Sequence, residues 1–156
     1  MTLPQESAAI AQLPPAGHDV PPGFVPYLAH QGGFVDTCCT FYVNRERLVV
    51  AARIISAHLN PLRIAHGGLL ATLADTALGT VIKMKMGTPY PPITASLVTD
   101  YMSPAREGDW VEARVEIDKQ GSRIVNATCT LWVGARLITR ATGVFLPNGG
   151  MPRAAA

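Results

Sequence analysis

The chain is predicted to fold as an α+β domain in which an antiparallel sheet wraps around one long central helix. Its 156 residues are enough to bury one hydrophobic core. Residues 67–86 form an apolar segment with helical spacing, whereas the segments around it are β-rich and separated by glycines. Because no second long helix is indicated, only a sheet can cover this apolar helix.

Two strands are expected before the helix, over residues 37–43 and 48–57, joined by a turn at 44–46. Asn60 and Pro61 end the second strand and begin a loop. The helix carries one apolar stripe and ends at Gly87 and Pro89. The stripe consists of Leu70, Leu73, Ala74, Ala77, Val81 and Met84.

Four strands are expected after the helix, arranged as a meander with glycines at the turns. In the second of them charged residues occupy alternate positions, as expected for a sheet with one solvated face. Such a sheet has open edges, which favour dimerisation. The expected strands cover residues 94–102, 109–119, 123–133 and 136–146.

Three regions are expected along the chain: a flexible arm over 1–22, the folded domain over 23–147 and a flexible tail over 148–156. No signal peptide is indicated at the N-terminus. The apolar segment 64–82 contains His66 and Asp75, so we interpret it as a buried helix and expect no membrane association. We expect a cytoplasmic protein.

Composition narrows the classes of partner and ligand. Hydrophobic residues make up 48% of the chain and charged residues only 15%, which indicates surface buried against further copies. The net charge of +2 includes no basic run, so nucleic acid is not an expected partner. The three cysteines fit neither a zinc spacing nor a disulfide framework, so no metal site is expected.

The segment from His66 to Asp75 carries the strongest chemical signal. Gly67 and Gly68 begin the helix, where backbone N–H groups lack intrahelical partners and the helix dipole favours negative charge. These amides suit a developing oxyanion. Asp75 is the only charged side chain between His66 and Lys83, so this carboxylate requires a partner or a role.

Helix geometry places the Gly67 amide and the Asp75 carboxylate far apart. Gly67 and Asp75 are eight residues apart, about 12 Å of rise and about 80° of rotation. Reacting atoms must come within about 3.5 Å, so one helix cannot present both groups to one carbonyl. Two antiparallel helices across a two-fold axis would form two identical sites, each taking one group from each chain.

Several motifs together resemble a known family. Asn60-Pro61, His66-Gly67-Gly68, Asp75 and the segment from Tyr101 to Ala105 are similar to those of hotdog-fold acyl-CoA thioesterases of the phenylacetic-acid-degradation (PaaI-like) type. The resemblance covers residues 34–146. It implies a hotdog fold, an acyl-CoA thioester as substrate, and homodimers that pair into homotetramers. It also implies no metal and no separate cofactor, because CoA is part of the substrate.

The resemblance also implies roles for single residues. Asp75 matches the catalytic carboxylate, which acts as general base on water or as nucleophile, and the sequence does not separate these two roles. The Gly67 N–H would polarise the thioester carbonyl, Asn60 would position substrate or water, and Thr94 would lie near that water. His66 matches a residue of the catalytic motif that orients the loop.

The CoA phosphates require cations at the entrance of the site. Arg106 and Arg123 lie at strand-start turns that resemble the family's nucleotide contacts, and the turn amides of Gly121 and Ser122 would assist. Gly68 is the remaining expected substrate contact.

Two other functions stay open: an acyl-CoA-binding module without catalysis, and a hotdog dehydratase or hydratase that would use His66 with Asp75. The acyl group, whether aryl, short-chain or medium-chain, is left open as well.

Overall fold

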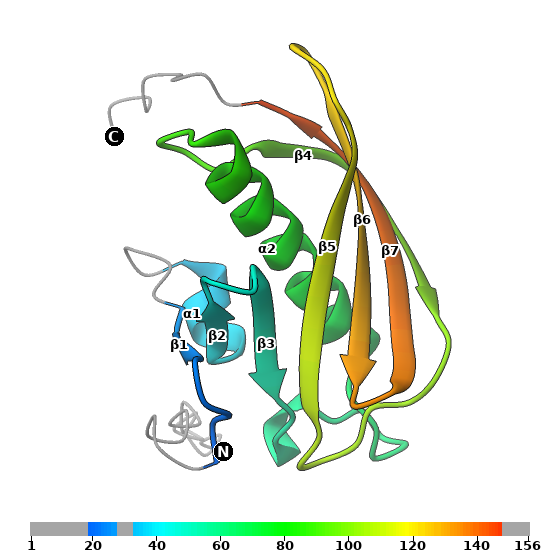
Figure 1. Cartoon of the computed structure of the whole chain (residues 1–156). Helices are drawn as coiled ribbons and strands as arrows, with labels where there is room; N and C mark the ends of the chain where they lie inside the picture. The colour runs from blue at the N-terminus through cyan, green and yellow to red at the C-terminus, as the bar shows by residue number, and fades with distance from the viewer. Residues whose placement is uncertain (1–18, 28–32, 148–156) are drawn as a thin grey trace, which may run out of the picture.

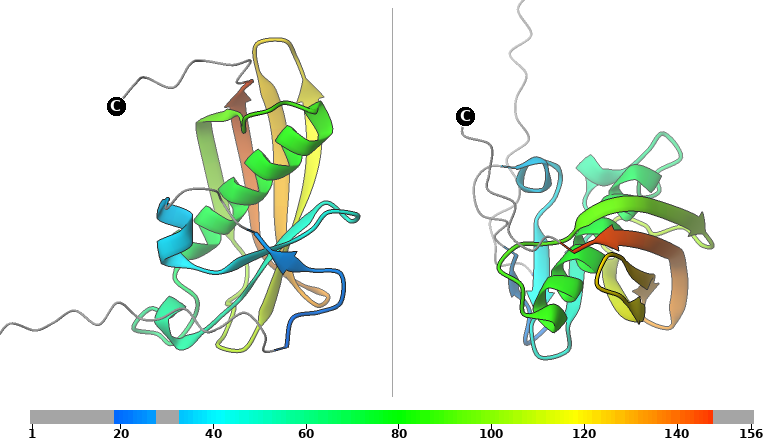
Figure 2. Two further views of the ribbon diagram at one scale, coloured as in Figure 1. Left: turned by 90° about the vertical axis from the view of Figure 1, so that its left-hand side faces the viewer. Right: turned by 90° about the horizontal axis from the view of Figure 1, so that it is seen from above.

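A computed structural model describes residues 19–27 and 33–147 of the chain. Most of the predicted arm and the predicted tail therefore lie outside the described residues. Within them, seven strands form one antiparallel sheet that curves around the long helix α2 (Gly67–Met86), which confirms the predicted α+β hotdog architecture (Figures 1 and 2).

The sheet order is β1-β2-β3-β5-β6-β7-β4. A short helix, α1, precedes β2, and a 3-10 turn, η1, follows β3. The bounds are β1 Val25–Pro26, α1 Phe34–Cys38, β2 Phe41–Asn44, β3 Val49–Arg53, η1 Ser56–His58, β4 Ile93–Tyr101, β5 Trp110–Gln120, β6 Val125–Val133 and β7 Arg136–Leu146.

The predicted four-strand meander is wrong for its first strand. β5, β6 and β7 follow one another as hairpins, but β4 pairs with β7, with Leu97 opposite Gly143 and Tyr101 opposite Thr139. β5 pairs with β3 instead, and this pairing joins the two halves of the sheet. β4 is therefore left at the far edge, beside β7 (Figure 2).

The two strands predicted before the helix are shorter than expected. Thr37 and Cys38 belong to α1 rather than to a strand, and the Thr37 hydroxyl donates to the Phe34 carbonyl at 2.8 Å. This local hydrogen bond outweighs the β-propensity of the segment. The second strand ends at Arg53, because the chain turns into η1 three residues later.

Helix α2 has the predicted bounds, and a local signal defines each end. His66 is the N-cap, and its side chain accepts the Gly68 N–H. Gly87 ends the helix with φ of 63°, in the left-handed region that glycine enters at low cost. The buried face of α2 packs against the inner face of the sheet, including Leu131, Ile138 and Phe145.

A second, smaller cluster covers the outer face of the sheet. Phe24, Tyr42 and Trp110 pack there, with the Trp110 ring 5.2 Å from that of Phe24 and 5.3 Å from that of Tyr42. The Arg53 guanidinium lies over the Trp110 ring and donates to the carbonyls of Gly108 and Asp19. The segment before β1 is thereby held against the sheet.

No helix among the described residues is long and apolar enough to cross a membrane.

His58 connects η1 to the start of α2. Its Nδ1 accepts the Ile55 N–H at 3.1 Å, and its carbonyl accepts the His66 N–H at 2.9 Å. The side chain is 7% exposed, and burial lowers the pKa of its imidazole.

We predict that acid destabilises the protein through His58. Because folding lowers the pKa of His58, the unfolded chain binds a proton at a higher pH than the folded one does. The contribution of His58 to the free energy of unfolding is therefore fully present above about pH 6.5 and falls below it. His58→Asn keeps an acceptor for Ile55 and should flatten this fall. Urea unfolding at about pH 7.5 and about pH 5.5 gives the free energy of unfolding at each pH. An equal loss of this free energy between the two pH values in parent and variant would contradict the prediction.

Candidate active site

The loop before α2 is organised by Asn60. Its side-chain oxygen accepts the N–H groups of Leu62 at 2.9 Å and Ile64 at 3.4 Å, and its backbone pairs with Ile64 and Arg63. These bonds hold Arg63 at φ of 58°, a conformation that side chains rarely adopt. The Asn60 oxygen is therefore used within the loop, and the hydrogen bonds of the described residues leave its NH₂ group, a donor, without a partner.

The first turn of α2 leaves one amide available. The Gly68 N–H donates to His66 Nδ1 at 2.9 Å, and the N–H groups of Leu69 and Leu70 donate to the His66 carbonyl. None of the hydrogen bonds between described residues uses the Gly67 N–H. Of the two predicted helix-start amides, Gly67 is thus the one without a partner among the described residues, and Gly68 is occupied by its cap.

Asp75 lies in the middle of α2 and is held by β4. The Thr94 hydroxyl donates to Asp75 Oδ1 at 2.8 Å, so the structure brings these two predicted residues together. No described residue donates to the second carboxylate oxygen of Asp75. Gly67 lies eight residues away on the same helix, so the backbones of these two residues are about 12 Å apart along the axis.

β4 also contacts the other end of this segment. The Tyr101 hydroxyl donates to the Gly67 carbonyl at 2.9 Å. Sequence reasoning placed Tyr101 in a motif but gave it no role, because its contact with Gly67 depends on where β4 lies.

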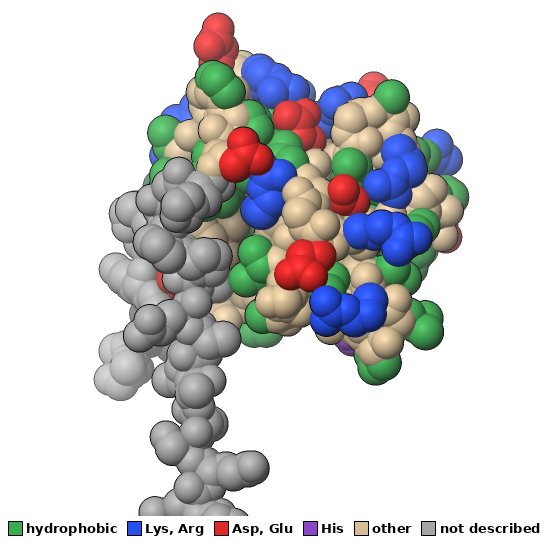
Figure 3. Space-filling model, turned by 90° about the horizontal axis from the view of Figure 1, so that it is seen from below, with side chains coloured by type: hydrophobic (Ala, Val, Ile, Leu, Met, Phe, Trp, Pro, Cys, Tyr) green, Lys and Arg blue, Asp and Glu red, His purple; other side chains and the backbone are tan. Residues whose placement is uncertain are grey.

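The turn between β4 and β5 is fixed near the start of α2. The Ala65 N–H donates to the Ala105 carbonyl at 2.8 Å, and Arg63 pairs with Glu107 at 3.1 Å. Arg136 pairs with Asp109 at 3.1 Å and donates to the Pro104 carbonyl. The guanidinium of Arg106 makes no hydrogen bond or ion pair with any described residue. Figure 3 shows cationic side chains interspersed with carboxylates on this end of the molecule.

The other predicted CoA contacts lie at the opposite end of the sheet. Gly121, Ser122 and Arg123 form the turn between β5 and β6, where the Gly121 N–H donates to the Ile124 carbonyl at 2.9 Å. β5 has 11 residues, so about 35 Å of strand separates this turn from Arg106 (Figure 1). One chain does not bring Arg106 and Arg123 together.

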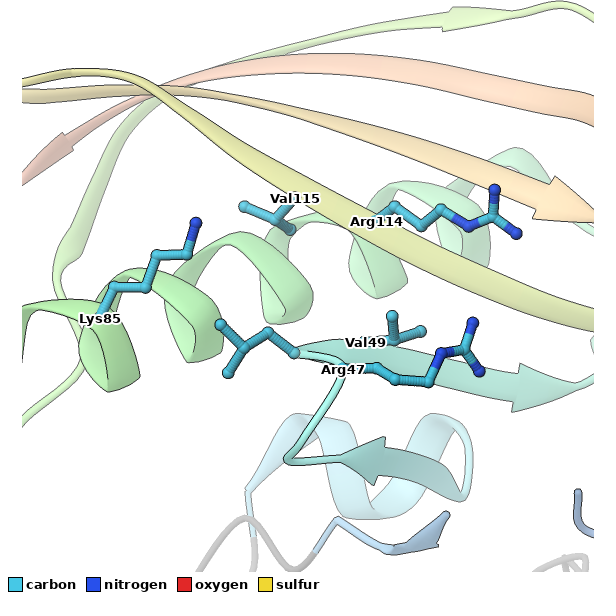
Figure 4. Close-up of a pocket in the computed structure, with 6 residues that line it drawn as sticks. Arg47, Val49, Lys85, Arg114 and Val115 are labelled. Atoms are coloured by element: carbon cyan, nitrogen blue, oxygen red, sulfur yellow. The ribbon is translucent and has the colours of Figure 1, made fainter. Parts of the chain in front are cut away.

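A hollow of about 400 Å³ lies beside the C-terminal part of α2, away from Gly67. Its cations do not converge: Arg47 and Arg114 both bind Glu112 and point away from Lys85 (Figure 4). Its lining consists of Arg47, Leu48, Val49, Lys85, Arg114 and Val115.

Neither a metal site nor a reactive thiol is evident in the described part of the chain. No group of three His, Cys, Asp or Glu side chains is placed to hold a metal ion there. Cys39 and Cys129 are buried, and burial raises the pKa of each thiol to about 12. A thiol with so high a pKa carries almost no thiolate, the nucleophilic form, at neutral pH.

Comparison with known proteins identifies the family. The thioesterase superfamily model matches residues 62–138. A Pseudomonas aeruginosa protein named a "putative esterase" is 40% identical over 130 residues, which cover 81% of this chain and 96% of that protein. Acyl-coenzyme A thioesterase 13 of Mus musculus is 33% identical over 104 residues, covering 67% of this chain and 69% of its own.

Two solved structures share the fold. A variant of the phenylacetic acid degradation protein PaaI from Thermus thermophilus is 30% identical, with a TM-score of 0.58 over 64% of this chain and 84% of that one. A Bacillus halodurans protein solved with CoA is 26% identical, with a TM-score of 0.60 over 65% of this chain and 67% of that one. The chain belongs to the thioesterase superfamily and is a hotdog-fold enzyme of the PaaI-like type.

We predict that the Thr94 hydroxyl contributes to thioesterase activity by holding Asp75. Thr94→Val keeps the shape but removes the donor, and it should lower kcat on the order of tenfold, because hydrogen bonds to charged groups are the stronger ones. Thr94→Ser keeps the donor and serves as the matched control. Steady-state kinetics of both variants measure this, and a Val variant as active as the Ser variant would contradict it.

Proposed function

We propose that the protein is an acyl-CoA thioesterase that hydrolyses its substrate to a free acid and CoA. The observation that carries this proposal is that one helix of a thioesterase-superfamily fold holds both an N-terminal amide, that of Gly67, which no described residue occupies, and a carboxylate, that of Asp75. The relatives named as acyl-CoA thioesterases and the neighbour solved with CoA support the choice of thioester.

The chemistry follows from these two groups. The Gly67 N–H and the helix dipole stabilise the negative charge that develops on the thioester oxygen. Asp75, with one oxygen held by Thr94, uses the other to accept a proton from the attacking water. The tetrahedral intermediate then breaks its C–S bond, and the CoA sulfur leaves as a thiolate that takes up a proton. In the alternative route, the carboxylate itself attacks and water hydrolyses the resulting anhydride.

We further propose that each site takes Gly67 from one chain and Asp75 from its partner in a homodimer. The distance of about 12 Å along one helix supports this arrangement. So does β4, an edge strand that exposes large apolar side chains: Ile93, Val98 and Tyr101, with Met102 just beyond it. The low charge content favours pairing of such dimers into a homotetramer.

A dimer would also bring Arg106 of one chain near Arg123 of the other. Arg106 lies at the Gly67 end of one chain, and the Gly121–Ser122–Arg123 turn lies at the far end of the sheet, so a partner chain is needed to bring both to one substrate. We propose that these cations and turn amides bind the CoA phosphates. The three unpaired cysteines suit a reducing compartment, and we propose a cytoplasmic location.

The geometry gives less support to a dehydratase. That reaction needs a base that removes a proton from a C–H bond, whereas His66 Nδ1 already accepts the Gly68 N–H. The neutral ring then carries its proton on Nε2 and has no free nitrogen to act as that base. The acyl-CoA-binding module without catalysis is the alternative that the experiment below distinguishes.

Asp75→Asn should abolish hydrolysis while leaving the fold and the assembly intact. The amide is isosteric but cannot accept the proton, so we expect kcat to fall by about three orders of magnitude. Release of free CoA from aryl, short-chain and medium-chain thioesters, followed with a thiol reagent, measures it. Parental turnover by the variant would remove Asp75 from the mechanism, and CoA binding without release by the parent would favour the binding module.

A further inference from the structure

We propose that Tyr101 is a positioning residue that fixes the direction of the Gly67 amide. This inference rests on the proposed role of that amide. Gly67 is the first residue of α2, so its N–H has no intrahelical acceptor. The direction of this N–H therefore depends on how the peptide groups on either side of Gly67 are held.

The peptide group between Gly67 and Gly68 is held at both ends. Its carbonyl accepts the Tyr101 hydroxyl at 2.9 Å, and its N–H donates to His66 Nδ1 at 2.9 Å. The Thr99 hydroxyl lies 3.4 Å from the Tyr101 oxygen as its donor. Tyr101 and His66 thus act on opposite ends of one peptide plane, and hydrogen bonds in such a chain strengthen one another.

This peptide adjoins the one that carries the Gly67 N–H. That neighbouring peptide is held at its carbonyl, which belongs to His66 and accepts the N–H groups of Leu69 and Leu70. Two successive fixed peptide planes leave the Gly67 N–H a single direction. Catalysis by such an amide depends on that direction, because donors must already point to where the charge develops.

Packing supports the same assignment. The Tyr101 ring lies so close to Gly67 that a Cβ there would meet its Cζ and Oη at 3.2 Å. The ring is 52% exposed elsewhere, so burial in the core does not explain its place. The ring is instead placed by its contact with Gly67, a contact that the hydrophobic core does not need.

Tyr101→Phe removes only the hydroxyl and tests the proposal in two ways. We expect kcat to fall about tenfold with KM within about twofold, because the donor is tilted rather than lost. In the ¹⁵N-labelled protein, we expect the Gly68 amide proton to move upfield, because its peptide carbonyl loses a hydrogen bond. Tyr90→Phe is the matched control, because the Tyr90 hydroxyl makes no hydrogen bond with a described residue.

A double-mutant cycle separates positioning from a general loss of structure. His66→Ala removes the acceptor of the Gly68 N–H, at the other end of the same peptide group. The loss of kcat in the double variant should be smaller than the product of the two single losses. His66→Asn keeps a capping acceptor and should restore most of the activity. An unchanged Gly68 resonance in Tyr101→Phe would overturn the proposal even if the parent lacked thioesterase activity. Unchanged kcat, or a raised KM alone, would overturn it in an active enzyme.

Discussion

The unoccupied amide at the start of α2 is the feature on which the rest of the site depends. A helix begins with N–H groups that lack partners, and this chain satisfies them selectively. His66 accepts the Gly68 N–H with its side chain and those of Leu69 and Leu70 with its carbonyl. The Gly67 N–H, at the positive end of the helix dipole, has no partner among the described residues. The oxyanion donor that we propose therefore results from how the other amides are capped.

The edge strand β4 contacts both Gly67 and Asp75. Thr94 at its start binds Asp75, and Tyr101 at its end binds the Gly67 carbonyl. The same strand exposes apolar side chains and unpaired backbone groups. Because β4 contacts both Asp75 and Gly67 and is also an exposed edge, the proposed dimer contact and the proposed catalytic groups lie on the same strand. The separation of Arg106 from Arg123 along β5 agrees with a substrate that spans two chains.

Local signals were sufficient to predict some elements and not others. The bounds of α2 follow from His66 and Gly87, which are neighbours in sequence of the residues they cap. The partner of β4 depends on long-range pairing, which the residues of the strand itself do not specify. The β-rich residues around Thr37 form a helical turn through a side-chain hydrogen bond that composition does not show. Which glycine amide stays free depends on the His66 side chain, and the contact of Tyr101 depends on β4, so neither could be predicted.

Mixed assemblies test most directly whether each site is built from two chains. One chain carries Asp75→Asn and the other Gly67→Pro, which removes the amide proton. Proline suits a first helical position, since His66 already has φ of −62° and ψ of 133°. The added Cβ meets only the Tyr101 ring, which is 52% exposed and must shift by a few tenths of an ångström. Each variant alone should be folded and inactive. Equal coexpression yields mixed dimers with one intact site, so about a quarter of the parental activity should return if the sites are shared. Activity no higher than that of the separate variants would place both groups in one chain and contradict the account.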